Sequence, residues 1–294
     1  MINALISNKM DTQNLGLYAA ILGEHPSKGA RSPVLWNAAF KAHDLNQRML
    51  PLDVNQNNII QLLDELNDDK KFIGGAVAVP YKETVAQWLG EKITPEAKKI
   101  GAVNCIFRGD DGRLVGTNTD GEAARITHED KFGSLNGKSV VILGAGGAGK
   151  AVIAYFRVAV GSGDITVISR SPKDKEYVAK IGAKWAPWEN IDNYLVGVDV
   201  LVNCTSVGFG KQENESPLSD DQLDKLTKSA SVFDIIYQPK ETVLLNRARK
   251  RGIATMNGLK MNLEQAIIAY RHTAQEPKGG EVARSAMESA AANT

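Results

Sequence analysis

Short apolar runs alternate with amphipathic stretches through the first part of the chain. Strand-like apolar runs occupy 18–22, 48–53 and 72–79, and helical spacing of apolar residues occupies 33–44 and 57–66. Such alternation is typical of a parallel sheet, because each helix carries the chain back to the start of the next strand. The pattern therefore predicts an α/β domain with a mainly parallel sheet at the beginning of the chain.

The stretch that follows, up to residue 120, predicts smaller elements. A helix is expected to begin near Lys82 and a short one after Thr94, and the apolar segments 103–108 and 114–118 flank a Gly-Asp-Asp-Gly turn typical of a β-hairpin. Residues 1–15 are polar and show no apolar period. We therefore expect them to form a loosely ordered extension.

A second series of strands begins in the middle of the chain. Its apolar runs occupy 140–143, 164–168, 198–203 and 232–237, again separated by segments long enough for helices. A series of this length predicts a compact, doubly wound parallel sheet of the Rossmann type. The fold class is thus α/β with two domains.

The domain boundaries follow from these two series. The last helical patterns, 260–272 and 281–290, come after the second series, and we expect them to pack against the first domain. The predicted organisation is a substrate-binding catalytic domain of residues 1–120 plus 256–294 and a dinucleotide-binding domain of residues 121–255. A cleft between two α/β domains is a favoured place for a reaction.

A glycine-rich turn directly follows the strand 140–143. Gly144, Gly146 and Gly149 have the spacing that a dinucleotide requires: a tight turn, a close approach of the backbone to a pyrophosphate, and close packing of helix on strand. Gly147 and Ala148 lie between them, where the first N–H groups of the next helix face the phosphates. In this context the turn predicts a dinucleotide site.

The end of the next strand is where such a site distinguishes its cofactors. An acidic residue there binds a ribose 2′-hydroxyl, but this chain has Ser169-Arg170-Ser171-Pro172-Lys173. Two hydroxyls and two cations suit a 2′-phosphate, and Arg170 offers a planar fork to its oxygens. The segment therefore favours NADP over NAD, the alternative being a solvated surface turn.

The composition and the net charge of the chain limit the kinds of molecule that it is expected to bind. The chain has 294 residues, 43% of them hydrophobic and 23% charged, with a formal net charge of +1. This balance indicates a soluble globular protein and gives no basic field for nucleic acid, so a small-molecule partner is expected. Four scattered histidines lack the spacing of a metal site. The pattern does not distinguish a monomer from a homodimer.

The cysteines and the apolar runs bear on location. Cys105 and Cys204 form neither a disulfide framework nor a Cys-x-x-Cys pair, which fits a reducing compartment. No apolar run reaches the roughly 18 residues that span a bilayer, and no secretory signal is visible. A cytoplasmic protein without membrane contact is the expectation.

Lys82 and Asp120 are the candidates for proton transfer. An enzyme that oxidises an alcohol needs a group that takes the hydroxyl proton, and Lys82 follows Val79-Pro80-Tyr81 at a strand end, where a helix begins. Asp120 lies where the chain passes from the first domain to the second. The alternatives are a solvated surface lysine and an aspartate that stabilises a turn before Gly121.

From about Tyr18 to its C-terminus, the chain resembles the shikimate and quinate dehydrogenases. The resemblance rests on ordered motifs: Ser32-Pro33 followed by Asn37, Val79-Pro80-Tyr81-Lys82-Glu83, Gly101-Ala102-Val103-Asn104, Asn118-Thr119-Asp120-Gly121, the glycine turn, Asn203-Cys204-Thr205-Ser206-Val207-Gly208, Asp234 through Tyr237 with Pro239, and Gly258 leading to Gln265-Ala266. Their common order is far more specific than any one motif.

The resemblance implies a role for each of these residues. It makes Lys82 the acid/base residue and Asp120 its partner. It implies substrate contacts from Ser32, Asn104, Tyr237 and Gln265, and a nicotinamide side lined by residues 203–207, which include Thr205, Ser206 and Val207. Gly258 is a further cofactor-binding residue that it implies. Structural alternatives are a turn cap for Asn104, an ordinary strand-end aromatic for Tyr237 and an exposed helix position for Gln265.

The chain departs from the family pattern at the substrate wall. The family's Ser-x-Ser-Pro, whose hydroxyls grip the substrate carboxylate, is Ala30-Arg31-Ser32-Pro33 here, and its Asn-Val-Thr-Val-Pro has Ala76 and Ala78 in place of the amide and the hydroxyl. Two lost hydrogen bonds weaken binding by about ten- to a hundredfold. We therefore expect a substrate that differs from shikimate at this end, unless Arg31, Ser27 or Lys28 replaces the contacts.

The leading hypothesis is an NADP-dependent alcohol dehydrogenase that transfers hydride reversibly between nicotinamide and the ring hydroxyl of shikimate or a close analogue. The first alternative is a quinate, aminoshikimate or other hydroxylated ring carboxylate dehydrogenase. A second alternative is a regulatory protein that binds NADP(H) without turnover. The presence of Lys82 and Asp120 argues against it, because a pure binder needs no proton shuttle.

Overall fold

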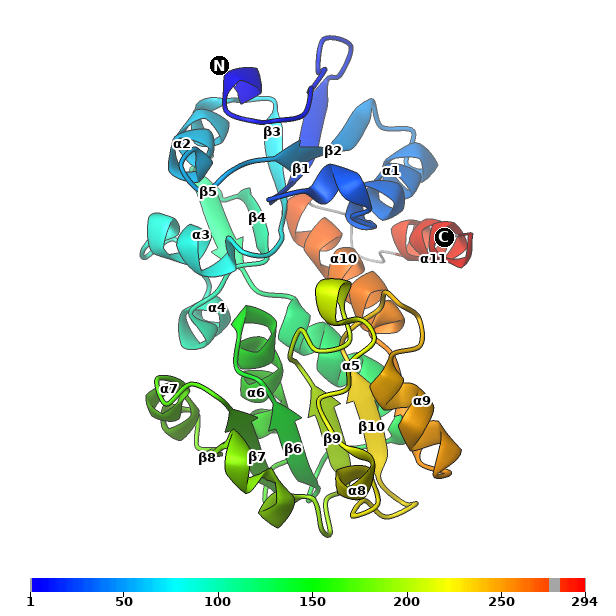
Figure 1. Ribbon diagram of the computed structural model, residues 1–294. Coiled ribbons are helices and arrows are strands. Elements are labelled where there is room, and N and C mark those ends of the chain that lie inside the picture. The colour runs from blue at the N-terminus through cyan, green and yellow to red at the C-terminus, as the bar shows by residue number, and fades with distance from the viewer. Residues whose placement is uncertain (1, 275–280, 294) are drawn as a thin grey trace. The chain divides into compact units, whose positions relative to one another are not determined.

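The computed structural model describes residues 2–274 and 281–293, which form two compact units (Figure 1). Unit 1 contains the residues up to Thr119 and those from Leu263 onward, and unit 2 contains Asp120–Asn262. Each unit is built on its own sheet with helices packed against it. The predicted two-domain α/β class is confirmed.

The sheet of unit 1 has five strands in the order β2-β1-β3-β4-β5. The first three strands along the chain pair in parallel, and the last two form an antiparallel hairpin. The strands are β1 (Leu17–Gly23), β2 (Gln47–Asp53), β3 (Phe72–Val77), β4 (Cys105–Arg108) and β5 (Leu114–Thr117). The expected hairpin and the mainly parallel pairing are both present.

Helices cover both faces of this sheet, which explains why β1 is apolar at nearly every position. Tyr18, Ala20 and Leu22 of β1 pack in the cluster of α2 and α3, whereas Ala19 and Ile21 pack in the cluster of α1, α10 and α11. Successive side chains of a strand point to opposite faces, so a strand covered on both sides must be apolar throughout. The helices of this unit are α1 (Ser32–Ala42), α2 (Ile59–Asp68), α3 (Lys82–Leu89), α4 (Pro95–Ile100), α10 (Leu259–Thr273) from Leu263 onward, and α11 (Glu281–Ala292).

The expectation of a loosely ordered N-terminal extension is wrong for residues 2–15. Leu5 and Ile6 are buried in the cluster beneath α2, and Ile6 forms a β-bridge with Val54. Asn8 donates its amide to the carbonyl of Pro51 and accepts the N–H of Asp53. Because β2 is an edge strand of the sheet, this segment satisfies backbone groups that would otherwise be open to solvent.

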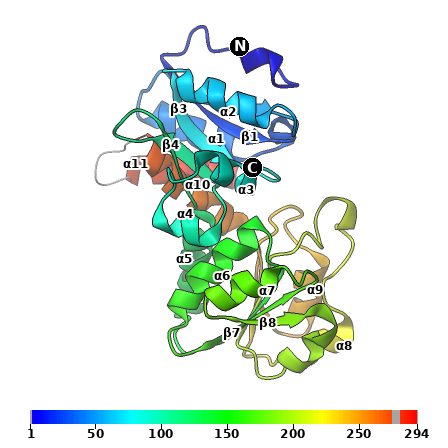
Figure 2. The ribbon, with the colours of Figure 1, turned by 90° about the vertical axis from the view of Figure 1, so that its left-hand side faces the viewer.

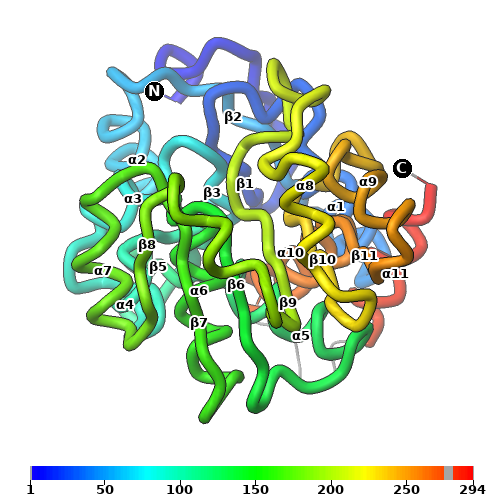
Figure 3. Tube along the Cα trace, turned by 60° about the horizontal axis from the view of Figure 1, so that its bottom comes forward, coloured from blue at the N-terminus to red at the C-terminus, as the bar shows by residue number. Residues whose placement is uncertain are grey.

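The sheet of unit 2 has six strands in the order β11-β10-β9-β6-β7-β8, and every neighbouring pair is parallel. Figure 3 shows this order across the sheet, with β8 at one edge and β11 at the other. The strands are β6 (Ser139–Leu143), β7 (Asp164–Ser169), β8 (Lys184–Pro187), β9 (Val200–Asn203), β10 (Ser231–Asp234) and β11 (Ala254–Met256). This is the strand order of the doubly wound dinucleotide-binding fold, with its switch point between β6 and β9.

The helices of unit 2 pack against this parallel sheet and against each other. They are α5 (Asp120–Phe132), α6 (Gly147–Ala159), α7 (Asp174–Lys180), α8 (Asp220–Leu223) and α9 (Val243–Lys250). Helix α5 lies against α6 so closely that a Cβ on Gly121 would stand 2.3 Å from the carbonyl oxygen of Ala151. A glycine is therefore required at the start of α5.

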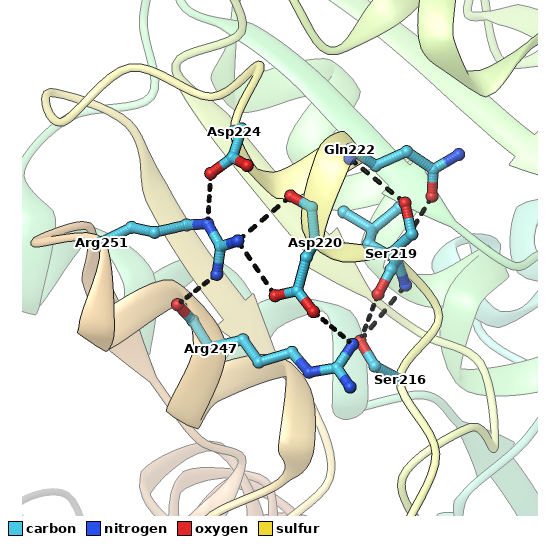
Figure 4. A network of polar contacts seen from close by, with 8 residues as sticks. Ser216, Ser219, Asp220, Gln222, Asp224, Arg247 and Arg251 are labelled. Carbon is cyan, nitrogen blue, oxygen red and sulfur yellow. Dashed lines mark hydrogen bonds and ion pairs between the residues drawn. The ribbon is translucent and has the colours of Figure 1, made fainter.

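An ion-pair network on the surface links α8 to the end of α9 (Figure 4). Arg251 contacts Asp224 at 2.6 Å through Nε and Asp220 at 2.9 Å through Nη2, and Arg247 reaches Asp220 at 3.5 Å. These groups are partly or largely exposed, so solvent screens each pair and its contribution to stability is small. The network orients α8, whose N-terminus is also closed by a Ser219–Gln222 capping box.

A buried histidine makes the stability of unit 2 depend on pH. His128 of α5 is 2% exposed, lies between the rings of Phe132 and Phe156, and finds no hydrogen-bond partner for either ring nitrogen among the described residues. Burial lowers the pKa of His128 to about 4. The neutral imidazole is therefore the form that fits this core.

Replacing His128 with Leu should make unit 2 more resistant to acid. The folded imidazole binds a proton less readily than the unfolded one, so stability is lost as the pH falls from 6.5 through about 4, by up to roughly 3 kcal/mol. Thermal unfolding at pH 7 and pH 4.5 should show a smaller fall in Tm for His128→Leu than for the wild type. Replacement of the exposed His25 by Gln serves as the control, and an equal fall in all three proteins would contradict the expectation.

Candidate active site

The candidate substrate residues of unit 1 follow strand ends that meet at one edge of its sheet. In the parallel register, Gly23 of β1 pairs with Asp53 of β2, and Leu22 pairs with Val77 of β3. The segments that leave these strands carry Ser32 and Lys82. Asn104, which precedes antiparallel β4, lies at the same edge because its neighbour Cys105 pairs with Ala76 near the end of β3.

Lys82 is the first residue of α3, and its backbone is held from two sides. Its carbonyl accepts the N–H of Val103 at 2.9 Å, and the preceding Tyr81 donates its own N–H to Ala78 at 3.1 Å. The hydroxyl of Tyr81 is buried and donates to the carbonyl of Val54 at 2.7 Å. Burial, with a smaller contribution from Glu24, raises the pKa of Tyr81, so the phenol remains a donor. The backbone from which the Lys82 side chain extends is therefore fixed. The hydrogen bond of the Tyr81 hydroxyl, which contributes to this, was not identified from the sequence.

Asn104 and Gln265 are joined through Thr119, all within unit 1. The side chain of Asn104 donates to the hydroxyl of Thr119 at 3.0 Å and accepts its backbone N–H at 2.7 Å. The same hydroxyl donates to the carbonyl of Gln265 at 3.1 Å. Asn104 is 2% exposed, and this network fixes its orientation. The sequence analysis quotes Thr119 within the motif Asn118-Thr119-Asp120-Gly121 but gives it no role.

Two residues proposed to replace the missing substrate contacts have partners inside unit 1. Ser27 donates its backbone N–H to one carboxylate oxygen of Asp53 at 2.8 Å and its hydroxyl to the other at 2.5 Å. Arg31 directs one guanidinium nitrogen to the carbonyl of Ala291 at 3.4 Å. Ser32 itself is buried at the start of α1. The Ser27 hydroxyl is therefore engaged with a carboxylate.

The alanines at the substrate wall form part of an apolar surface. Ala76 belongs to the buried cluster of α1, α10 and α11, and Ala30 and Ala78 pack against that cluster. A Cβ on Gly23 would stand 3.1 Å from the methyl of Ala78, so the strand ends approach closely there. The wall thus presents methyl groups where the family pattern has an amide and hydroxyls.

The glycine turn of unit 2 has the close contacts that its sequence predicts. Gly144 has a φ of +89°, and a Cβ on Gly149 would stand 2.6 Å from the carbonyl oxygen of Gly144. A Cβ on Gly146, by contrast, would meet nothing within 4 Å. Gly146 precedes the first turn of α6, so its backbone borders open space at the positive end of that helix. Gly147 and Ala148, which begin α6, are half-buried.

A hydrogen-bond network shapes the loop that follows β9. Asn203 accepts from both the N–H and the hydroxyl of Thr205 and donates to Val207 and to the carboxylate of Asp234. Thr205 in turn accepts the N–H of Val207 at 3.1 Å. This loop touches the glycine turn, because a Cβ on Gly144 would stand 3.0 Å from a methyl of Thr205. Ser206 in the same loop is exposed.

Asp234 is the buried end of this network. It is fully buried and accepts hydrogen bonds from Thr242 at 2.7 Å, from the N–H of Ile236 at 3.1 Å and from Asn203 at 3.1 Å. Burial raises its pKa to about 6, and these three donors oppose the shift. Burial also raises the pKa of the Cys204 thiol, which stays protonated.

The segment at the end of β7 contains one buried hydroxyl, that of Ser169, and two exposed cations, Arg170 and Lys173. Ser169 is 4% exposed, and its hydroxyl accepts from the indole of Trp185 at 2.9 Å and donates to the carbonyl of Ser171 at 3.3 Å. Arg170 and Lys173 are exposed, and within the described parts of the chain neither has an ion-pair partner. The Ser169 hydroxyl therefore stabilises the turn, and the side chains of Arg170 and Lys173 are accessible to an anion from solvent.

The remaining candidate residues also belong to unit 2. Asp120 begins α5, and Tyr237 follows β10 in a half-buried position. Gly258 packs against the segment after β10, because its N–H donates to Ile236 and a Cβ would stand 2.0 Å from the carbonyl oxygen of Ile235. Only a glycine fits at that position.

Residues 2–274 and 281–293 contain neither a candidate metal site nor a membrane-spanning helix. No three His, Cys, Asp or Glu side chains within these ranges gather closely enough to hold a metal ion. No helix in them is long and apolar enough to cross a membrane.

Comparison with known proteins matches both units. The family model for the shikimate dehydrogenase substrate binding domain matches residues 21–106, and that for shikimate / quinate 5-dehydrogenase matches residues 127–235. A shikimate dehydrogenase (NADP(+)) of Methanocaldococcus jannaschii is 35% identical over 254 residues, which are 84% of this chain and 88% of that protein.

Solved structures are similar over nearly the whole chain. A shikimate 5-dehydrogenase of Thermus thermophilus, solved with NADP(H) and shikimate, superposes with a TM-score of 0.78 at 28% identity, covering 93% of this chain and 99% of that one. The ligand-free 5-ketofructose reductase of a Gluconobacter species superposes with a TM-score of 0.76 at 27% identity, covering 94% and 99%. The fold therefore occurs with more than one substrate.

Alanine at two positions of the glycine turn should separate folding from ligand binding. Gly149→Ala forces a methyl against the Gly144 carbonyl and should lower stability by about 1–3 kcal/mol, seen as a lower Tm. Gly146→Ala meets open space and should keep the wild-type Tm, yet weaken dinucleotide binding about tenfold or more because the methyl occupies that space. Unchanged dinucleotide affinity in Gly146→Ala would refute this assignment of the turn.

Proposed function

The chain belongs to the shikimate and quinate dehydrogenase family, and from this premise we propose that it is an NADP-dependent oxidoreductase that interconverts a ring hydroxyl and a ring ketone. The substrate pair is shikimate and 3-dehydroshikimate, or a close analogue. The observation that carries this proposal is the match of both family models to consecutive parts of one chain. The chain is an enzyme that acts on a small molecule.

The two parts of the reaction are assigned to different stretches of the chain. Residues 1–120 plus 256–294 hold the substrate, and residues 121–255 hold NADP. The match of the substrate-domain model to 21–106 and the doubly wound strand order of unit 2 support this division. The two free thiols, Cys105 and Cys204, support a reducing compartment such as the cytoplasm.

The residues of unit 2 fit NADP. The open space at Gly146 suits a pyrophosphate, and the exposed cations Arg170 and Lys173 suit a 2′-phosphate. Thr205, Ser206, Val207 and Gly258 are assigned to the nicotinamide side. When bound there, NADP would supply the hydride acceptor for the oxidation of the hydroxyl and, in its reduced form, the hydride donor for the reduction of the ketone.

Lys82 is assigned the proton transfer. In the oxidation, its Nζ accepts the hydroxyl proton as the C–H electron pair leaves, and in the reduction it gives that proton to the carbonyl oxygen. Asp120 is its partner and keeps it oriented. The rigid backbone around Lys82, fixed through Tyr81 and Val103, supports this role because a positioned acid/base group needs a fixed support.

Asn104, Gln265, Ser32 and Tyr237 are assigned to the substrate. Their amide and hydroxyl groups match a ring that carries several hydroxyls. The Thr119 network supports the assignment of Asn104, since a side chain that is fixed in advance loses little freedom when it binds a ligand.

A second candidate substrate lacks a carboxylate. It is favoured by the methyl groups of Ala30 and Ala78 and by the engagement of Ser27 with the carboxylate of Asp53. A wall of this kind offers little to an anion but tolerates an uncharged polyol or ketose. The structural likeness to a 5-ketofructose reductase is consistent with such a substrate.

Replacing Lys82 with Ala should remove turnover and leave the cofactor bound. Loss of the acid/base group lowers kcat by about 10²–10⁴-fold, whereas the Kd for NADPH, followed by its fluorescence, should stay within about twofold of the wild type. Lys99→Ala, at an exposed position of α4, is the matched control and should keep full activity. A Lys82→Ala protein with more than a tenth of wild-type kcat would rule out the assigned role.

Hydroxyl side chains introduced at positions 30 and 78, where the family pattern has them, should improve the binding of shikimate. We expect the Ala30→Ser/Ala78→Thr double variant to raise kcat/KM for shikimate by about ten- to a hundredfold, and to change that for an uncharged ketose far less. Initial rates with shikimate, quinate, aminoshikimate and 5-ketofructose would measure this, with Ala42→Ser at the exposed end of α1 as control. A wild-type enzyme that prefers shikimate, and gains nothing from the double variant, would exclude the altered wall.

A further inference from the structure

Asp234 and Asn203 lie side by side at the carboxyl ends of two neighbouring strands. They are partners in the register of β10 and β9, so their side chains point to the same face of the sheet. Both residues are fully buried, which keeps a ligand from reaching either side chain directly. A buried carboxylate or amide is costly unless its hydrogen bonds are made. The partners of these two groups therefore define their role.

The amide of Asn203 holds the loop that begins after it. Its oxygen accepts the N–H of Thr205 at 3.0 Å and the Thr205 hydroxyl at 2.7 Å. Its nitrogen donates to the carbonyl of Val207 at 3.2 Å and to the carboxylate of Asp234 at 3.1 Å. Both lone pairs of the oxygen and both protons of the nitrogen are thus engaged. One side chain fixes the loop 204–207.

Asp234 determines which way this amide is turned. Burial raises the pKa of Asp234 to about 6, so the group is ionised at neutral pH and only accepts hydrogen bonds. The opposite orientation of the Asn203 amide would place its oxygen against this carboxylate and its nitrogen against the N–H of Thr205. Both contacts are repulsive in a buried site. The Val207 carbonyl favours the same orientation, but it belongs to the loop itself, whereas Asp234 belongs to β10.

The other contacts of Asp234 reach the remaining segments at this end of the sheet. Its second oxygen accepts the hydroxyl of Thr242 at 2.7 Å, and Thr242 is the N-cap of α9, the helix beside β10 (Figures 1 and 2). The oxygen that faces Asn203 also accepts the N–H of Ile236 at 3.1 Å. The carbonyl of Ile236 in turn accepts the N–H of Gly258 at 2.9 Å. One carboxylate thereby joins the loop after β9, the segment after β10 and the start of α9.

We propose that Asp234 is a positioning residue for hydride transfer, which holds the loop 204–207 against the nicotinamide half of NADP by orienting Asn203. This inference rests on the proposed use of NADP and on the assignment of that loop to the nicotinamide side. The buried carboxylate acts through Asn203 and contacts neither substrate nor cofactor. The cations assigned to the 2′-phosphate follow β7, which β9 and β6 separate from β10. Loss of Asp234 therefore affects the nicotinamide side and leaves the adenosine side unchanged.

The first measurement follows the loop in the protein without ligand. Asp234→Val removes the acceptor and keeps a residue that suits a buried strand. The backbone amides of Thr205 and Val207 should then exchange with deuterated solvent about tenfold faster, as read by NMR. Thr242→Val is the matched control, because it removes a hydrogen bond to the same carboxylate and leaves the contact with Asn203, so exchange should stay within about twofold. If Asp234→Val does not fold, Asp234→Ser, whose hydroxyl stands one bond farther from Asn203, is measured in its place.

The second measurement follows the reaction and the adenosine half of the cofactor. Asp234→Val should lower kcat with shikimate and NADP+ about tenfold or more, and leave the Kd of adenosine 2′,5′-bisphosphate within about twofold, because that ligand lacks the nicotinamide half. Asp234→Asn retains an oxygen for Asn203 and should keep kcat within about threefold of the wild type. Thr242→Val should lower the Tm, through loss of the α9 cap, and keep the wild-type kcat.

The outcomes separate this inference from the function beneath it. If Asp234→Val and the wild type exchange the amides of Thr205 and Val207 at the same rate, the loop holds itself and the role of Asp234 is overturned, whatever the substrate is. If Asp234→Val and Thr242→Val speed exchange and lower kcat alike, Asp234 supports folding alone and its positioning role is overturned. If the wild type neither binds the bisphosphate nor reduces NADP+, the use of NADP is wrong, even where exchange shows that Asp234 holds the loop.

Discussion

The close packing of the α6 N-terminus onto the ends of β6 and β9 is the contact on which the site of unit 2 depends. Gly149 brings the helix against the carbonyl of Gly144, and the Asn203–Thr205 loop lies against the same turn. Because β6, β7, β9 and β10 run parallel, their carboxyl ends meet at this edge. A side chain at Gly149 would push the helix away and open the whole edge.

In unit 1, too, parallel strands end at one edge of the sheet, and there they position the proposed substrate and proton-transfer residues. Its parallel strands end in segments that carry the proposed proton-transfer residue, Lys82, whose backbone is fixed by Tyr81 and Val103. The alanines at the same edge complete an apolar surface with their methyl groups, and a change of side chain there leaves their backbone hydrogen bonds in place. The chemistry can therefore be kept while the substrate changes, which agrees with the likeness to both a shikimate dehydrogenase and a ketose reductase.

The sequence predicted those features that repeat along the chain or depend on single residue types. Apolar periods marked the long strands, and glycine spacing marked the dinucleotide turn. The edge strands β8 and β11 were not predicted, because each is short and partly exposed and so has no apolar run. The few apolar residues of 1–15 show no period, so the sequence indicates a loosely ordered extension, yet Leu5 and Ile6 are buried in the cluster of α2 and Ile6 forms a bridge with Val54, directly after β2.

The hydrogen-bond partners that polar residues find in the folded chain could not be predicted from the sequence either. Ser169 was chosen as a phosphate ligand, but a partner sixteen residues away, Trp185, occupies its hydroxyl. Thr119 was seen only as part of a motif, although it contacts both Asn104 and Gln265, which lies 146 residues after it in the chain. Hydrogen bonds between distant residues leave no local pattern. The role of such residues becomes visible only when the fold brings the partners together.

The central claim is that unit 2 binds a phosphorylated dinucleotide for hydride transfer at the site of Lys82. The most direct test is the initial rate of absorbance change at 340 nm with wild-type enzyme and saturating shikimate, with NADP+ and NAD+ compared as cofactors. The account predicts reduction of NADP+ with a kcat/KM about a hundredfold or more above that of NAD+, as two or more charge-assisted contacts to one phosphate would give. Equal or better use of NAD+, or no reduction of either cofactor with any substrate of the panel, would contradict it.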